Sequence, residues 1–281
     1  MEINNSRRSF LKTSATIAAG SMLIPAFAEP GKAKKVGLQL YSVRNEMLKD
    51  AVGTLTRLAK IGYKELESAR SDKGNYYGLT AKEIKKITKD LGMKLVSGHV
   101  HINEHWQKSI DDAVEAGQDY LICSSMPSKG QTIENYQKTA DIFSKAGEDC
   151  AKAKLQFGYH NHDYEFEKVG DKVLYDVLLE RTDPKFVKME LDLGWVVVTG
   201  NDPIAYFKKY PNRFPLWHLK DMNAVKKQST EFGKGVMDIK AMMQSAKMSG
   251  MKHFFVEQEE YTNTAFESIE QDYKYLKNLV F

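Results

Sequence analysis

The sequence has few of the features that define several common classes of protein. Its 281 residues include only two cysteines, Cys123 and Cys150, so a disulfide-rich scaffold and a CxxC-type zinc site are both excluded. Cys123 lies in an apolar run and Cys150 in a helical one, which favours two buried thiols over a disulfide. The chain also has no G-x-G-x-x-G, P-loop or G-x-S-x-G motif.

Strong charge is also missing. The net charge is +4, and Arg7, Arg8 and Lys12 together with Glu2 contribute +2 of it, which leaves 4 − 2 = +2 for the rest. A nucleic-acid-binding surface normally requires a much larger basic excess. We therefore expect no nucleic-acid partner.

The N-terminal segment has the pattern of an export signal. Arg7 and Arg8 precede a weakly apolar run over 11–28, which ends in a small-x-small pattern at Ala26-Phe27-Ala28. This resembles a twin-arginine signal, and it predicts cleavage after Ala28 and a periplasmic protein. The alternative is a membrane anchor, but Thr, Ser and Gly within the run argue against a stable span.

The remaining 281 − 28 = 253 residues, 29–281, alternate eight times between short apolar runs and amphipathic segments. This alternation predicts one α/β domain, a closed (β/α)8 TIM barrel. A doubly wound open sheet is the alternative, but the first turn, "LYSVRNE", lacks the expected glycines. The predicted strands are 35–42, 63–68, 94–100, 119–125, 156–162, 185–195, 214–221 and 253–259, and the predicted helices are 47–62, 80–92, 104–117, 132–154, 172–181, 202–210, 238–250 and 264–280.

Polar residues gather where the later strands end. They come in pairs two residues apart, so both members point to the same side of the sheet. Because the apolar residues between them pack against helices, that side is the barrel interior, and in a barrel the strand ends form the active face. The pairs are His99 and His101, His160 and His162, Glu190 and Asp192, His218 and Lys220, and Glu257 and Glu259.

Several carboxylates in one small cavity require a cation or protons. Histidine with aspartate and glutamate suits Mn²⁺, Mg²⁺, Co²⁺ or Zn²⁺ better than a thiolate-preferring metal. The alternative is a network of salt bridges in which Lys220 and Arg44 balance the acids. The number of contributing strands favours the divalent metal.

Taken together, the segments "GYHNHDYEF", "ELDLGW", "WHLKD", "GKGVMDIK" and "FFVEQE" resemble the xylose isomerase-like TIM barrels. That family includes sugar isomerases, ketose 3-epimerases, inosose dehydratase and endonuclease IV. The resemblance implies a metal held from strands five to eight, by His160, Asp192, His218 and Glu257. His160 stands where most members have glutamate, and Glu165 a few residues on is the alternative ligand.

The resemblance also implies proton abstraction next to a sugar ketone through an enediolate. Glu257 or Glu259 could be the base, and Lys220 could donate to the developing oxyanion. We expect substrate contacts from four further residues: His99, His162, Glu165 and Trp195. For Trp195 the alternative is packing in the cavity wall.

The resulting hypothesis is a metal-dependent sugar isomerase or epimerase that acts on a free sugar or keto-sugar. A lyase or dehydratase is the first alternative, because a histidine at position 160 removes one of the two carboxylates that a ketose 3-epimerase uses. A non-catalytic carbohydrate-binding barrel is an alternative of another class. The expected partner is a small carbohydrate; a homo-oligomer is compatible with the sequence, whereas an endonuclease is opposed by the low charge.

Overall fold

The structure is a computed structural model that describes residues 35–223 and 225–281. The predicted export signal, residues 1–28, lies outside the described residues. No helix in the described part of the chain has the length and apolar character needed to span a membrane.

Eight parallel strands close into a barrel, which confirms the predicted (β/α)8 fold. The first strand pairs with both the second and the last, so the sheet has no free edge. In order along the chain, the barrel strands are β1 (Gly37–Gln39), β2 (Glu65–Ser68), β3 (Lys94–Val100), β4 (Tyr120–Cys123), β5 (Gln156–His160), β8 (Val187–Asp192), β9 (Leu216–Leu219) and β12 (His253–Val256).

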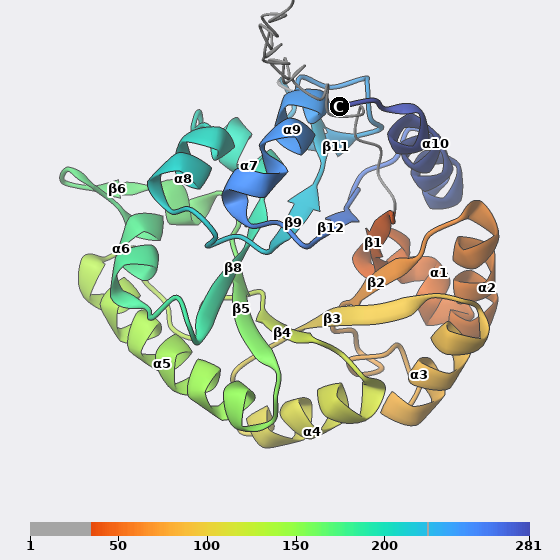
Figure 1. Cartoon of the computed structure of the whole chain (residues 1–281), viewed down its shortest axis with the longest axis horizontal. Helices are drawn as coiled ribbons and strands as arrows, with labels where there is room; N and C mark the ends of the chain where they lie inside the picture. Colours follow the sequence, from red (N-terminus) through yellow and green to blue (C-terminus); the bar gives the residue numbers. More distant parts are fainter. Residues whose placement is uncertain (1–34, 224) are drawn as a thin grey trace, which may run out of the picture. The chain divides into compact units, whose positions relative to one another are not determined.

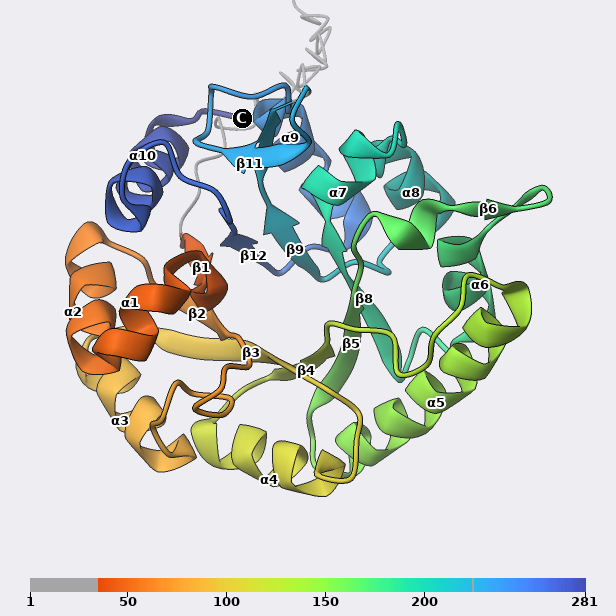
Figure 2. The ribbon, with the colours of Figure 1, turned by 180° about the vertical axis from the view of Figure 1, so that it is seen from behind.

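Helices surround the barrel on its outside (Figures 1 and 2). They are α1 (Arg44–Lys49), α2 (Ala51–Ile61), α3 (Ala81–Asp90), α4 (Trp106–Ala116), α5 (Ile133–Lys152), α6 (Leu174–Arg181), α7 (Leu193–Val198), α8 (Pro203–Lys209), α9 (Ile239–Ser249) and α10 (Ala265–Asn278). The 3-10 helices η1 (Leu40–Val43) and η2 (Tyr164–Phe166) follow β1 and β5. Two hairpins lie outside the barrel: β6 (Lys168–Val169) with β7 (Lys172–Val173), and β10 (Asp221–Asn223) with β11 (Gln228–Thr230).

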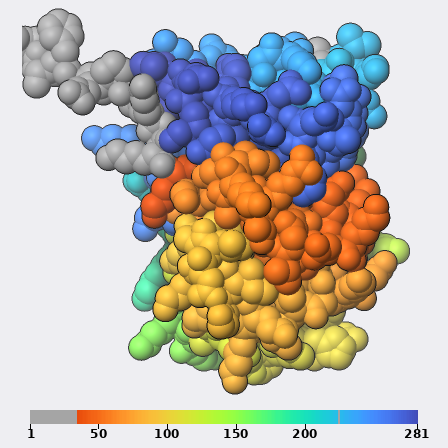
Figure 3. Space-filling model, turned by 90° about the vertical axis from the view of Figure 1, so that its right-hand side faces the viewer, coloured from red at the N-terminus to blue at the C-terminus, as the bar shows by residue number. Residues whose placement is uncertain are grey.

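Local sequence signals set the ends of these helices. Thr80 begins α3 with a capping box to Glu83, and Thr264 begins α10 with the same arrangement to Glu267. Gly117 ends α4 in the left-handed conformation that glycine adopts without strain. The last helix, α10, packs beside the N-terminal elements, so the first and last elements of the barrel domain lie side by side (Figure 3).

The barrel has two apolar regions. A large outer core lies between the strands and the helices and contains both cysteines, which are free and buried as predicted. A small inner core fills the barrel: Val96, Tyr120, Ile122, Leu216 and Phe255. Leu216 and Phe255 lie two residues before His218 and Glu257, so they share the inward side with those polar residues. The inner core therefore forms the floor beneath the polar strand ends.

Candidate metal centre and cavity

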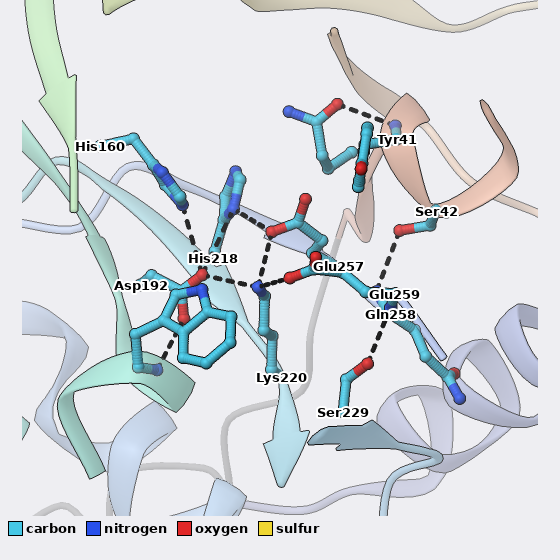
Figure 4. A network of polar contacts seen from close by, with 12 residues as sticks. Tyr41, Ser42, His160, Asp192, His218, Lys220, Ser229, Glu257, Gln258 and Glu259 are labelled. Atoms are coloured by element: carbon cyan, nitrogen blue, oxygen red, sulfur yellow. Dashed lines mark hydrogen bonds and ion pairs between the residues drawn. The ribbon is translucent and has the colours of Figure 1, made fainter. Parts of the chain in front are cut away.

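The polar strand ends converge inside the barrel, as the spacing of two predicts. Figure 4 shows His160, Asp192, His218 and Glu257 gathered around Lys220. These five side chains come from β5, β8, β9 and the segments directly after β9 and β12, and all of them are buried. Neighbouring parallel strands deliver them to one point because their carboxyl ends lie at the same end of the barrel.

Four of these residues form a candidate metal centre. One ligand atom each from His160, Asp192, His218 and Glu257 lie within 4.8 Å of one another. His218 Nδ1 lies 2.7 Å from Glu257 Oε2, and His160 Nε2 lies 3.3 Å from Asp192 Oδ2. Imidazole nitrogens and carboxylate oxygens in this number suit a divalent cation such as Mn²⁺, Co²⁺ or Zn²⁺.

His160 shows that these residues fit a cation. Burial lowers the pKa of His160 well below its ordinary value, and the neighbouring His218 and His99 lower it further. The ring is therefore neutral, which is the form that binds a metal. Among the described residues, its Nδ1 atom has no hydrogen-bond partner although it is buried.

Asp192 uses its two carboxylate oxygens differently. Oδ1 accepts a hydrogen bond from the backbone N–H of Trp195 and so caps α7. Oδ2 points into the centre, toward His160 and Lys220. The backbone N–H of Asp192 donates to Asn161, which fixes the position of the residue from the β5 side.

Lys220 supplies a positive charge at the same point. Its Nζ atom lies 2.9 Å from Asp192 Oδ2, 3.0 Å from Glu257 Oε2 and 2.6 Å from Glu259 Oε1. Burial alone would lower the pKa of Lys220, but the three carboxylates outweigh it and raise that pKa well above its ordinary value. The residue is therefore an ammonium ion, and it lies 4.9 Å from the centre of the Trp195 ring.

A second buried cluster lies beside the first and shares His218 with it. His218 Nε2 lies 2.6 Å from Glu67 Oε1, and His99 Nε2 lies 3.1 Å from the same oxygen and 2.7 Å from Glu190 Oε2. Burial raises the pKa of Glu190 to about 7, and the carboxylate of Glu67 contributes to the rise. Burial would lower the pKa of His99, but Glu67 and Glu190 raise it to about 9. Glu67 is not among the site residues predicted from the sequence.

A cavity of about 290 Å³ opens above the centre. This volume lies near the lower end of the range for small-molecule sites, roughly 300–1,000 Å³, and suits a small ligand. Its inner wall contains seven of the residues expected from the sequence: His99, His160, His162, Trp195, Lys220, Glu257 and Glu259. The other lining residues are Tyr41, Ala69, Arg70, Ser71, Asp72, His101 and Ser124.

Two of the expected substrate contacts, His162 and Trp195, lie in this wall. Burial lowers the pKa of His162 to about 4, and the positive charge of Lys220 lowers it further. His162 is therefore a neutral ring, and its Nδ1 atom has no hydrogen-bond partner within the described part of the chain. His99 also reaches the cavity, although its Nε2 atom is engaged by Glu190.

Glu165 does not reach the cavity, contrary to expectation. Its carboxylate is completely buried on the other side of the strand, where it accepts hydrogen bonds from the Tyr159 hydroxyl and the His162 backbone N–H. Tyr159 faces the helices, since its ring packs against Phe143 of α5. His160, and not Glu165, therefore lies beside the other three candidate ligands.

A closed barrel with a buried, charged cavity at the carboxyl ends of its strands is the architecture of TIM-barrel enzymes. The model of the xylose isomerase-like TIM barrel family matches residues 55–279, and the chain belongs to this family.

Three relatives illustrate the similarity. A crystal structure of a sugar phosphate isomerase/epimerase from Parabacteroides distasonis is 32% identical, with a TM-score of 0.78 over 88% of this chain and 94% of that one. An inosose dehydratase from Clostridium beijerinckii is 33% identical over 110 residues, which is 37% of this chain and 36% of the relative. Another inosose dehydratase, from Geobacillus thermodenitrificans, is 28% identical over 142 residues, which is 44% of this chain and 47% of the relative. The matches thus span about a third to a half of the length of these curated relatives.

The fold is also shared with more distant proteins. The IOLI protein, crystallised with a bound zinc atom, is 14% identical and has a TM-score of 0.68 over 85% of this chain and 95% of that one. At this identity the likeness concerns the fold alone.

Proposed function

We propose that the protein is a divalent-cation-dependent enzyme that removes the proton next to the ketone of a free sugar or keto-sugar. The observation that carries the proposal is the convergence of His160, Asp192, His218 and Glu257 beside a cavity of about 290 Å³, which His160 and Glu257 line. The relatives named sugar phosphate isomerase/epimerase and inosose dehydratase support a sugar-like substrate.

The cation would be Mn²⁺, Mg²⁺, Co²⁺ or Zn²⁺, and the zinc atom of the IOLI protein supports this class of ion. When bound, it would neutralise the negative charge that develops on the substrate oxygens as the proton leaves. His160, Asp192, His218 and Glu257 would hold it. The burial of these four residues limits the access of competing water to the cavity side, where His160 and Glu257 lie.

Glu259 is better placed than Glu257 to act as the base. Glu257 Oε2 points to His218 and Lys220 at the candidate centre, whereas Glu259 lies further out in the cavity wall with Lys220 as its ion-pair partner. Burial raises the pKa of Glu259 above its ordinary value, which makes it a stronger base. Lys220, as an ammonium ion, would donate to the oxygen on which negative charge develops.

A second candidate function is elimination, as in a dehydratase or another keto-sugar lyase. The orientation of Glu165 argues against epimerisation and leaves elimination beside isomerisation, because the end of β5 contributes His160 and His162 to the cavity but no carboxylate. A ketose 3-epimerase of this family needs carboxylates on both faces of the sugar, whereas isomerisation and elimination need one. The matches to inosose dehydratases also support elimination.

The cellular setting is part of the proposal. The twin-arginine pattern of residues 1–28 supports a periplasmic enzyme, where a free sugar or an oxidised glycoside is a more suitable substrate than a sugar phosphate. A double substitution, Arg7→Lys with Arg8→Lys, should leave the precursor in the cytoplasm. Normal export of this variant would contradict the signal assignment.

The test is deuterium incorporation. The protein is incubated in D₂O with Mn²⁺ and a panel of ketoses, inososes and 3-keto-glycosides, and the products are followed by NMR. Proton abstraction followed by reprotonation places deuterium next to the carbonyl, and isomerisation also moves the carbonyl. If elimination follows instead, a carbon–carbon double bond forms at the carbon that lost its proton, and water or an alcohol is released. Glu257→Gln should suppress the exchange at least a hundredfold, about 2.7 kcal/mol, because it removes a candidate ligand's charge.

A matched control is Glu270→Gln. Glu270 pairs with Lys274 on α10 at 2.8 Å and does not line the cavity, so activity should persist. If a panel member binds in a metal-dependent way but neither exchanges deuterium nor forms an unsaturated product, the barrel is a carbohydrate-binding protein and not an enzyme. If exchange continues after verified removal of the metal, the proposed role of the cation is wrong.

A further inference from the structure

We propose that Glu67 is the positioning residue that holds His218 in the ring orientation and tautomer needed to bind the cation. The inference rests on the proposed function, since it concerns the same metal centre. Glu67 lies on β2, a strand that contributes none of the four candidate ligands.

The two ring nitrogens of His218 face different partners. Nδ1 lies on the side of the candidate ligands, 2.7 Å from Glu257 Oε2 and 3.8 Å from Asp192 Oδ2. Nε2 lies on the opposite side of the ring, 2.6 Å from Glu67 Oε1. A histidine that binds a metal through Nδ1 must carry its proton on Nε2, and here that N–H would donate to the Glu67 carboxylate.

Glu67 is itself held firmly. The amide of Gln39 on β1 donates to its Oε1 at 2.7 Å, and the hydroxyl of Ser97 on β3 donates to its Oε2 at 2.5 Å. The side chain is completely buried between these two neighbouring strands. A carboxylate fixed from both sides cannot turn away from His218, so it can set the angle of the imidazole ring.

The cluster of Glu67, His99, Glu190 and His218 also meets the distance criterion for a cation site. In that arrangement His218 would use Nε2 as its ligand atom, whereas in the proposed arrangement Nε2 carries a proton. The two possibilities differ in their ligands: Asp192→Asn should weaken Co²⁺ binding in the proposed arrangement and leave it unchanged if the ion lies in the other cluster.

The experiment compares Glu67→Gln with Glu65→Gln. Glu65 is a matched control, because it lies two residues earlier on the same strand, is buried, and pairs through Oε2 with His253 Nδ1 at 2.7 Å, away from the centre. Binding of Co²⁺ is measured by calorimetry and by the visible absorption of the bound ion, which reports its coordination geometry. We expect Glu67→Gln to weaken binding roughly 10- to 100-fold and to alter the spectrum. Glu65→Gln should bind one ion with the unaltered affinity and spectrum.

Other outcomes overturn the inference. A folded Glu67→Gln protein with unaltered affinity and spectrum would do so, as would equal weakening in both variants. Two ions in the unaltered protein, one of them lost in Glu67→Gln, would show that the second cluster binds a cation itself. If Glu67→Gln does not fold, Ser97→Ala replaces it, and unchanged Co²⁺ binding by that variant would also overturn the inference. Failure of the unaltered protein to bind any cation would overturn the proposed function itself, and the inference with it.

Discussion

Lys220 and a divalent cation would use the same oxygens. The ammonium group lies within 3.0 Å of both Asp192 Oδ2 and Glu257 Oε2, and both of these residues belong to the candidate metal centre. Two positive charges at this separation repel each other strongly in a buried site. Cation binding should therefore push Lys220 toward Glu259 and toward the substrate.

The first prediction follows from this competition. Lys220→Met should bind Mn²⁺ at least about tenfold more tightly, because a competing positive charge is removed. The same variant should lose catalytic activity, since it lacks the proton donor. Calorimetric titration measures the affinity, and Lys209→Met is the control, since Lys209 pairs with Asp176 outside the barrel at 2.8 Å. Unchanged or weaker Mn²⁺ binding by Lys220→Met would contradict the prediction.

The inward direction of the site residues could be predicted from the sequence because side chains alternate along a strand. The rule does not apply to Glu165, which lies in the 3-10 helix η2 and not in extended backbone; it was expected in the cavity but lies behind it. Glu67 was missed for a different reason. In "YKELES" it looks like a solvated acid, and its partners Gln39, Ser97 and His218 are 28, 30 and 151 residues away.

Among the elements, the turn at Gly233–Gly235 is held by Asp221. Its carboxylate accepts four backbone hydrogen bonds at 2.8–3.0 Å, from Met222, Gly233, Gly235 and Met237. The "GKG" segment is thus a turn, and the aspartate that follows β9 organises it. The adjoining hairpin carries Ser229, whose hydroxyl accepts the Glu259 N–H at 2.7 Å.

The second prediction concerns this turn. Asp221→Ala should lower the free energy of unfolding by about 3 kcal/mol, because several buried N–H groups lose their acceptor. It should also lower activity, through the loss of support for Glu259. Urea unfolding measures the first effect, and Asp90→Ala on the exposed end of α3 should change stability by less than about 0.5 kcal/mol. Equal stability of the two variants would refute the role of Asp221.

The third prediction is a pH dependence that originates in α10. Burial raises the pKa of Asp272 to about 8, and the nearby Glu231 and Asp221 carboxylates add to the effect. In the unfolded chain the same group titrates near pH 4, so the folded state holds the extra proton between about pH 4 and 8. Stability should therefore be greatest below this range and fall as the pH rises through it.

Asp272→Asn removes this titration and keeps an oxygen to accept the Phe232 N–H. The unfolding free energy of the variant minus that of the unaltered protein should be larger at pH 9 than at pH 5 by a few kcal/mol. Urea unfolding at the two pH values gives this difference directly. A difference that does not change with pH would contradict the assignment.

The order of elements could be predicted because the helical and strand periodicities are distinct. The short helix α7 was missed, since "LGWVVV" is as apolar as the strand before it and its cap, Asp192, was assigned to the strand. The two hairpins outside the barrel were missed as well, because strands of two or three residues leave no periodic signal.

At the scale of the whole molecule, the barrel should not need the ion to fold. The inner core and the outer core consist of apolar side chains, and none of the four candidate ligands belongs to either core. The fourth prediction is that EDTA abolishes activity but leaves the circular dichroism spectrum unchanged. Restoring Mn²⁺ at about 100 times its Kd should add about 2.7 kcal/mol to the free energy of unfolding. Loss of the folded spectrum on chelation would show that the ion is structural.

The two oxygens of Asp192 have a mechanical consequence for the whole barrel. The two oxygens of a carboxylate are fixed relative to each other. A cation that displaces Oδ2 would therefore also displace Oδ1, which caps the N-terminus of α7. The third residue of that cap is Trp195, whose ring lines the cavity. Asp192 thus links the candidate metal centre to the cavity wall at Trp195. Exchanging one metal for another of different radius would then reshape the space offered to the substrate.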